Sequence, residues 1–121
     1  MAIHYNLAKV FERTKGDDFL VKNEIKSFIL NIPIEMKILI SNIKSKQYLI
    51  VNELAEEIKP SLELMGMTIA HNEMIQVENW AINQGKRREI EATIESIKTQ
   101  IEKATKEMNK EYKVFESLKT F

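Results

Sequence analysis

The chain has 121 residues, of which 44% are hydrophobic and 30% are charged. This length suits one domain that builds a core without disulfides or a structural metal. The sequence contains no cysteine, which excludes disulfides, thiolate nucleophiles and cysteine-based zinc sites. The formal net charge is zero, which argues against general polyanion binding, and we expect no nucleic-acid partner.

Turn signals are rare, because the chain has only three glycines and two prolines. Lys, Glu, Ile and Leu dominate, and these residues favour helices, so we expect an all-α fold. No apolar run approaches the roughly 18–20 residues of a membrane span, and no membrane insertion is expected. Residues 1–5 lack the basic and apolar regions of a signal peptide, so the expected location is the cytoplasm.

The first third of the chain predicts three helices. A short helix is expected over residues 5–13, with inward-facing Leu7, Val10 and Phe11. Asp17 or Asp18 suits the N-cap of a second helix, which would end at about Asn31. Pro33 disfavours helical geometry in the residue before it but suits a first turn, so a third helix is predicted over residues 33–44.

A fourth helix is predicted over residues 47–65. Its apolar residues recur at spacings of three and four and form the stripe Tyr48, Val51, Ala55, Ile58, Leu62 and Met65. Pro60 lies inside this helix, where it removes the hydrogen bond to the carbonyl of residue 56 and predicts a kink or local opening. Gly66 suits the left-handed position that often follows a helix.

The remaining sequence predicts two more helices. One spans residues 68–83, and the last spans residues 86–118 with a heptad seam made of Ile90, Ile94, Ile97, Ile101, Ala104 and Met108. The last helix would be about 50 Å long at 1.5 Å per residue and would overhang its shorter neighbours. Its seam also suggests self-association through the C-terminal helix. An up-down four-helix bundle accounts for the chain before about residue 108.

The stretch over residues 55–66 has a pattern that helix packing alone does not explain. Ala55, Ile58, Lys59, Pro60 and Gly66 fall in the register Ala-His-x-Ile/Leu-Lys-Gly/Pro, followed by a glycine ten residues after the histidine. This pattern resembles the core motif of histidine phosphotransfer (HPt) domains. The match departs from the motif at one place, because Glu56 stands where the family has its phosphoacceptor histidine.

The resemblance implies an up-down four-helix bundle of HPt type, with a short N-terminal helix and a long C-terminal helix. The whole chain, 1–121, would then be one HPt-like domain with a core over about 5–108 and a helical extension over 109–121. Members of the family bind no cofactor, and the metal of the reaction belongs to the receiver domain. Ala55, Ile58 and Gly66 would be the structural residues of the motif.

The glutamate changes the expected function. Phosphotransfer needs a nucleophilic imidazole nitrogen, so we expect a module of a two-component phosphorelay that is not an enzyme. It would dock a response-regulator receiver domain, alone or in a hybrid histidine kinase, without accepting phosphate. The expected docking face consists of Asn52, Glu56, Lys59, Pro60 and Glu63. Glu56 and Lys59 could form an exposed pair on this helix.

Two alternatives remain open. His71 could be a displaced phosphoacceptor, although it lacks the lysine and small residues that surround the histidine in the motif. The chain could instead be a structural or oligomerisation module that associates through its last helix. A di-metal carboxylate site is not expected, because the sequence has no Glu-x-x-His pair. The basic run Lys86-Arg87-Arg88 reads as a solvated helix start.

Overall fold

The computed structural model describes residues 4–115, and all regular elements in that range are helices. They are α1 (Ala8–Thr14), α2 (Asp18–Lys44), α3 (Tyr48–Leu64), α4 (Thr68–Ile82) and α5 (Arg87–Tyr112). The all-α prediction is confirmed for this part of the chain. The predicted end of the last helix at residue 118 lies outside the described residues, whereas α5 itself ends at Tyr112. None of the described helices is long and apolar enough to cross a bilayer.

α2 is one continuous helix, and the predicted break before Pro33 is wrong. Pro33 cannot donate to the carbonyl of Ile29, and a proline inside a helix costs about 3 kcal/mol. The apolar residues of α2 nevertheless keep one register on both sides of the proline, and all are buried: Val21, Ile25, Phe28, Ile32, Met36, Leu39 and Ile43. Each buried side chain stabilises the fold by about 1.5–3 kcal/mol, so the continuous stripe outweighs the local cost.

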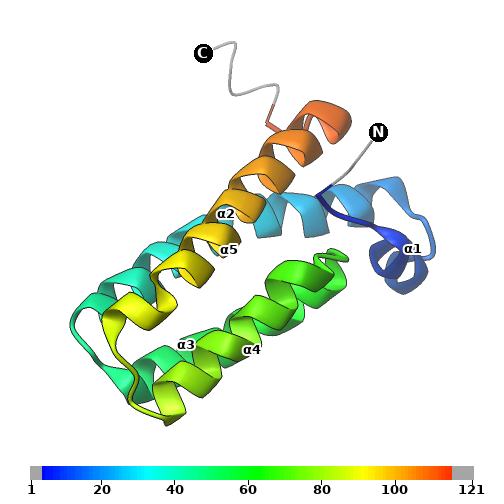
Figure 1. Ribbon diagram of the computed structural model, residues 1–121. Coiled ribbons are helices and arrows are strands. Elements are labelled where there is room, and N and C mark those ends of the chain that lie inside the picture. Colours follow the sequence, from blue (N-terminus) through cyan, green and yellow to red (C-terminus); the bar gives the residue numbers. More distant parts are fainter. Residues whose placement is uncertain (1–3, 116–121) are drawn as a thin grey trace.

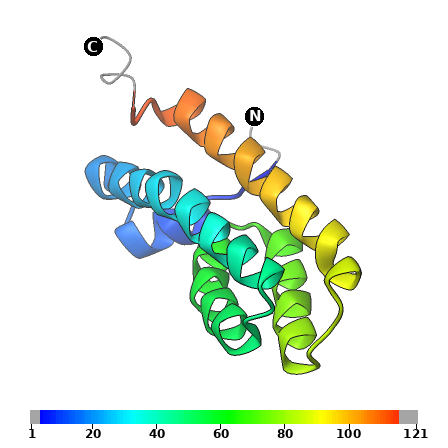
Figure 2. The same ribbon diagram turned by 90° about the vertical axis from the view of Figure 1, so that its left-hand side faces the viewer.

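The four long helices run alternately in opposite directions (Figures 1 and 2). α3 packs most extensively against α4, α2 packs against α3 and α5, and α5 also packs against α4. Short connections between successive helices produce this antiparallel order. Each long helix therefore has two helical neighbours and leaves an outward face, and α1 adds a further contact near the start of α2.

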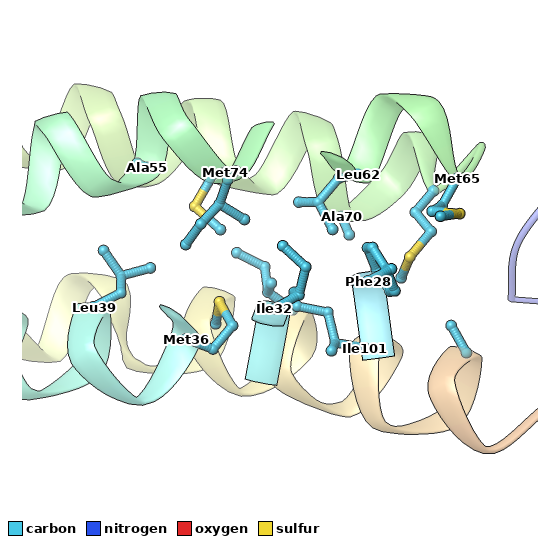
Figure 3. Packing of buried hydrophobic residues seen from close by; sticks show 14 of the residues in the cluster. Phe28, Ile32, Met36, Leu39, Ala55, Leu62, Met65, Ala70, Met74 and Ile101 are labelled. Carbon is cyan, nitrogen blue, oxygen red and sulfur yellow. The ribbon is translucent and has the colours of Figure 1, made fainter. Parts of the chain in front are cut away.

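The hydrophobic core lies between the α3–α4 pair and the α2–α5 pair (Figure 3). Met36 and Leu39 of α2 and Ile101 of α5 face Leu62 of α3 and Met74 of α4 across this core. The heptad seam of α5 is buried as well, from Ile90 through Met108. Because the seam packs into the chain's own core, it is not exposed for a second copy.

α2 and α5 extend beyond the α3–α4 pair. At 1.5 Å per residue they are about 40 Å long, against about 22–26 Å for α3 and α4. The sequence predicted such an overhang for the last helix alone. α1 and the segment before it occupy the space beyond the α3–α4 turn, where Tyr5, Leu7 and Val10 are buried. Phe11, predicted to face inward, is 41% exposed, because the inward face of this two-turn helix follows Leu7, Val10 and Thr14.

The segment before α1 also joins the end of α5. The backbone N–H of His4 donates to the Glu107 carboxylate at 3.3 Å, and the His4 side chain pairs with the same carboxylate. Burial raises the pKa of Tyr5 to about 12, with a further contribution from nearby Tyr112 and Glu111. The N-terminal segment is therefore packed beside the last turns of α5.

Two predicted local features are present. The Asp17 carboxylate accepts from the backbone N–H of Leu20 at 2.9 Å and caps α2, as expected. Gly66 has a φ of +65° after α3, and the Asn6 N–H donates to the carbonyl of Met65 at 2.9 Å. A Cβ on Gly66 would lie 2.5 Å from the Asn6 carbonyl oxygen, so this turn needs glycine for both its conformation and its close packing.

Candidate docking surface

Pro60 does not interrupt α3, which presents the predicted docking residues along one side. Ala55, Ile58 and Leu62 are fully buried beneath them. The side chains expected at the surface are Asn52, Glu56, Lys59, Pro60 and Glu63; Glu56, Pro60 and Glu63 are exposed, and the other two are half-buried. Glu56 makes no hydrogen bond or ion pair with any residue that the structure describes. Its carboxylate therefore stands alone in solvent at the centre of the row.

Lys59 does not pair with Glu56, contrary to the sequence-based expectation. Its Nζ atom lies 2.7 Å from Oε1 of Glu78 on α4, and the two side chains are only 25% and 13% exposed. The turn of α3 that carries Lys59 faces α4, so the ammonium reaches a carboxylate across the helix pair more readily than one on its own helix. Because both groups are partly desolvated, loss of either would leave a charge without its partner.

A matching row on α4 borders the same surface. His71, Ile75, Glu78 and Ile82 follow one another at +4, +3 and +4, so they share one side of the helix. Glu78 reaches Lys59, which shows that this side runs beside α3. Ile75 and Ile82 are 37% and 66% exposed. Together, the α3 and α4 rows form a mixed surface, called here the α3–α4 surface, with a central ion pair and two exposed isoleucines.

Sequence reasoning missed the α4 half of this surface. Ile75 and Ile82 lie beside the core stripe of α4, one position away from buried Met74 and Ala81. The available signal was their seven-residue spacing, which places both on one edge of α4, with Glu78 between them at +3 and +4. That pattern indicates a partly exposed edge and does not indicate a core stripe.

The α3–α4 pair is strongly acidic. Residues 48–82 contain six glutamates and one lysine, which gives a net charge of −5 in a chain whose total is zero. The one lysine is neutralised by Glu78. Glu53, Glu56 and Glu57 are exposed on α3. The surface therefore presents a negative field, which attracts basic groups and repels acidic ones over distances of about 10 Å at 0.1 M salt.

An open cavity lies at one end of the surface, between α1 and the α3–α4 turn. Its volume is about 360 Å³, and Lys9, Glu63, Thr68 and half-buried His71 contribute to its walls. Lys9 donates to Glu63 at 3.1 Å. This hydrogen bond, the charge of Lys9 and the nearby His71 hold the pKa of Glu63 below its ordinary value. The cavity thus brings His71 next to a lysine and a carboxylate, which the sequence did not predict.

The described residues contain no cluster of three or more His, Cys, Asp or Glu side chains placed to hold a metal ion. Comparison with known proteins yields no relative: no family model matches the chain, and neither a curated protein nor a solved structure matches it.

Proposed function

We propose that this chain is a non-catalytic, HPt-like signalling module that docks a response-regulator receiver domain through the α3–α4 surface. The receiver could be a separate protein or part of a hybrid histidine kinase. In this proposal the helices form an up-down bundle of the HPt type, and the protein acts in the cytoplasm as a binding partner.

The ion pair between Lys59 and Glu78 is the observation that carries the proposal. In HPt domains the corresponding lysine helps to hold the phosphoryl group on the histidine. Here Lys59 is occupied by a carboxylate at 2.7 Å, and the nucleophile is replaced by Glu56. Of the two groups that phosphotransfer would need, the phosphoacceptor is therefore replaced and the lysine is held in an ion pair. The row of side chains on α3 is nevertheless at the surface, as docking requires. Such a surface suits binding better than reaction.

The charge of Glu56 has a consequence for docking. The phosphorylation pocket of a receiver domain is acidic, so an exposed glutamate at the centre of the contact would oppose binding. The metal ion held by the receiver would offset this repulsion. We therefore expect docking that strengthens when the receiver is loaded with its divalent metal. Ile75 and Ile82 supply the apolar contact area that an ion pair alone does not provide.

Titration of isotopically labelled protein with purified receiver domains tests the proposal. Chemical-shift changes should cluster at Asn52, Glu56, Lys59 and Glu63 and should extend to Ile75 and Ile82. Ile75→Asp should weaken binding about tenfold or more, because it places a carboxylate in the apolar part of the contact. Ile34→Asp, on the outward face of α2, is the matched control and should bind normally. Absence of binding to every receiver encoded nearby would refute the proposal.

The cavity beside His71 favours a second candidate function. His71 could accept phosphate from a phosphorylated receiver, with Lys9 as the nearest cation on the cavity wall. Incubation with a phosphorylated receiver would then yield acid-labile phosphate on the protein. His71→Gln should abolish this signal, whereas in the docking proposal the wild-type protein takes up no phosphate.

A further inference from the structure

The outward face of α2 carries an aliphatic stripe formed by Leu30, Ile34 and Ile38. These residues follow one another at four-residue spacing and are 49%, 58% and 47% exposed. The buried residues of α2 lie on the opposite side of the helix. The polar neighbours on this face are uncharged, and the Asn31 amide donates to the Ser27 hydroxyl at 3.1 Å. No described helix covers the stripe.

The two edges of the stripe carry opposite charges. Exposed Lys26 and Lys37 lie along one edge. Glu24 and Glu35 lie along the other, where they border a cavity shared with α3. Residues two positions apart point to nearly opposite sides of a helix, so Lys37 cannot neutralise Glu35 within one chain. Glu24 on this edge pairs with Arg13 of α1, whose Nη2 atom lies 3.3 Å from its Oε1 atom. Glu35 forms no ion pair among the described residues, and burial and the nearby Glu57 carboxylate raise its pKa.

We propose that the stripe is the contact between two copies of this chain, related by a twofold axis parallel to α2. In this parallel pair the lysine edge of each copy faces the glutamate edge of the other, and each aliphatic residue meets its own counterpart. An antiparallel pair would place lysine against lysine and glutamate against glutamate. Charge complementarity therefore selects the parallel arrangement. The contact uses a different helix face from the α3–α4 surface and does not depend on the proposed function.

Disulfide crosslinking tests the geometry, because the chain has no cysteine of its own. The variants Leu30→Cys, Ile34→Cys and Ile38→Cys are oxidised separately under mild conditions. In the parallel pair all three positions lie near their counterparts, so each variant should give a covalent dimer. An antiparallel pair would crosslink only at the position nearest its axis. That result, or crosslinking at none of the three positions, would overturn the proposal. Ile82→Cys, 66% exposed on α4, is the matched control and should not crosslink.

Sedimentation equilibrium tests the association itself. The wild-type chain should show a monomer–dimer equilibrium, and Ile34→Asp should raise the dissociation constant on the order of 100-fold, because the apolar contact is lost in both copies. Ile82→Asp should leave the constant unchanged. Circular dichroism spectra of both variants should match the wild type, since both side chains are exposed. A wild-type mass that stays monomeric at every concentration would contradict the proposal.

Discussion

The α3–α4 surface and the α2 stripe are both exposed, yet their chemistry is opposite. The first combines an ion pair, a lone glutamate and two isoleucines within a segment of net charge −5. The second consists of three aliphatic side chains with charges only at its edges. One fold can thus separate a charge-governed contact from an apolar one by placing them on different helices. Experiments that change one surface and spare the other can therefore test each assignment independently.

The largest expected effect is the recovery of phosphate acceptance on the α3–α4 surface. Glu56→His supplies the missing imidazole but leaves Lys59 bound to Glu78. The double variant Glu56→His with Glu78→Gln supplies the imidazole and also frees the lysine. We expect the double variant to accept phosphate from a phosphorylated receiver at least about tenfold faster than Glu56→His alone, measured with radiolabelled phosphate. Equal rates would show that the ion pair does not restrain Lys59.

Gly66→Ala offers a way to disturb the end of the α3–α4 surface while leaving the α2 stripe intact. The new Cβ would press on Asn6 in addition to straining the positive φ, so we expect a loss of about 2–4 kcal/mol in the free energy of unfolding. Gly16→Ala is the matched control. Gly16 has a similar φ of +73° but an open environment, and its substitution should cost only about 1 kcal/mol. Urea denaturation measures both, and equal losses would contradict the packing argument.

Salt should separate the two contacts. Exposed charges are screened at high ionic strength, whereas aliphatic burial is not. For docking through the α3–α4 surface, raising salt from 50 to 500 mM should change the affinity about three- to tenfold. The dimer constant of the α2 stripe should change less than about threefold. Calorimetric titration and sedimentation at both salt concentrations would show whether the two responses differ.

Glu56→Gln sharpens the electrostatic part of the docking proposal. Removing the lone carboxylate should strengthen binding to a metal-free receiver a few-fold and should reduce the gain produced by divalent metal. Glu53→Gln, one turn earlier on α3, is a control that removes the same charge away from the centre of the row. An equal effect of both variants would indicate that the reduced net charge alone changes the affinity. It would contradict the placement of Glu56 at the centre of the contact.

The smallest expected effect concerns the acidic edge of the α2 stripe. Burial and Glu57 raise the pKa of Glu35, so ionised Glu35 destabilises the fold above that pKa, and this cost disappears as the pH falls and the carboxyl becomes protonated. Glu35→Gln should therefore raise the free energy of unfolding at pH 7 by less than about 1 kcal/mol, which would appear as a slightly higher melting temperature. The substitution should give no benefit near pH 3. A benefit that persists at pH 3 would show that the charge is not its origin.

Much of the fold could be predicted from residue spacing alone. The inward stripes of α3 and α5 were correct, because a face buried against two neighbours leaves a clear apolar period, as from Val51 to Leu62. The break at Pro33 was wrong because a local preference was weighed without the shared register of Val21 to Ile43. Pairing of long helices is a tertiary effect, and it overrides the cost of one missing hydrogen bond.

Of the candidate site, only the row on α3 could be predicted from the sequence. The position of Glu56 on the solvent side of α3 follows from helical periodicity. The partner of Lys59 does not, because Glu78 lies nineteen positions later and is brought close only by the packing of α4 on α3. The contribution of the exposed isoleucines of α4 could not be predicted for the same reason, because their edge of α4 forms a joint surface only through the packing of α3 beside it.

The contact between the N-terminal segment and the end of α5 has a consequence for local opening. His4 and Glu107 are 103 positions apart, yet they are hydrogen-bonded, and Tyr5 is buried beside the same turns. These turns lie beyond the α3–α4 pair, so they and the segment around His4 and Tyr5 protect each other from water. Amide hydrogen exchange should therefore report this segment and the last turns of α5 as one cooperative unit that opens before the centre of the molecule.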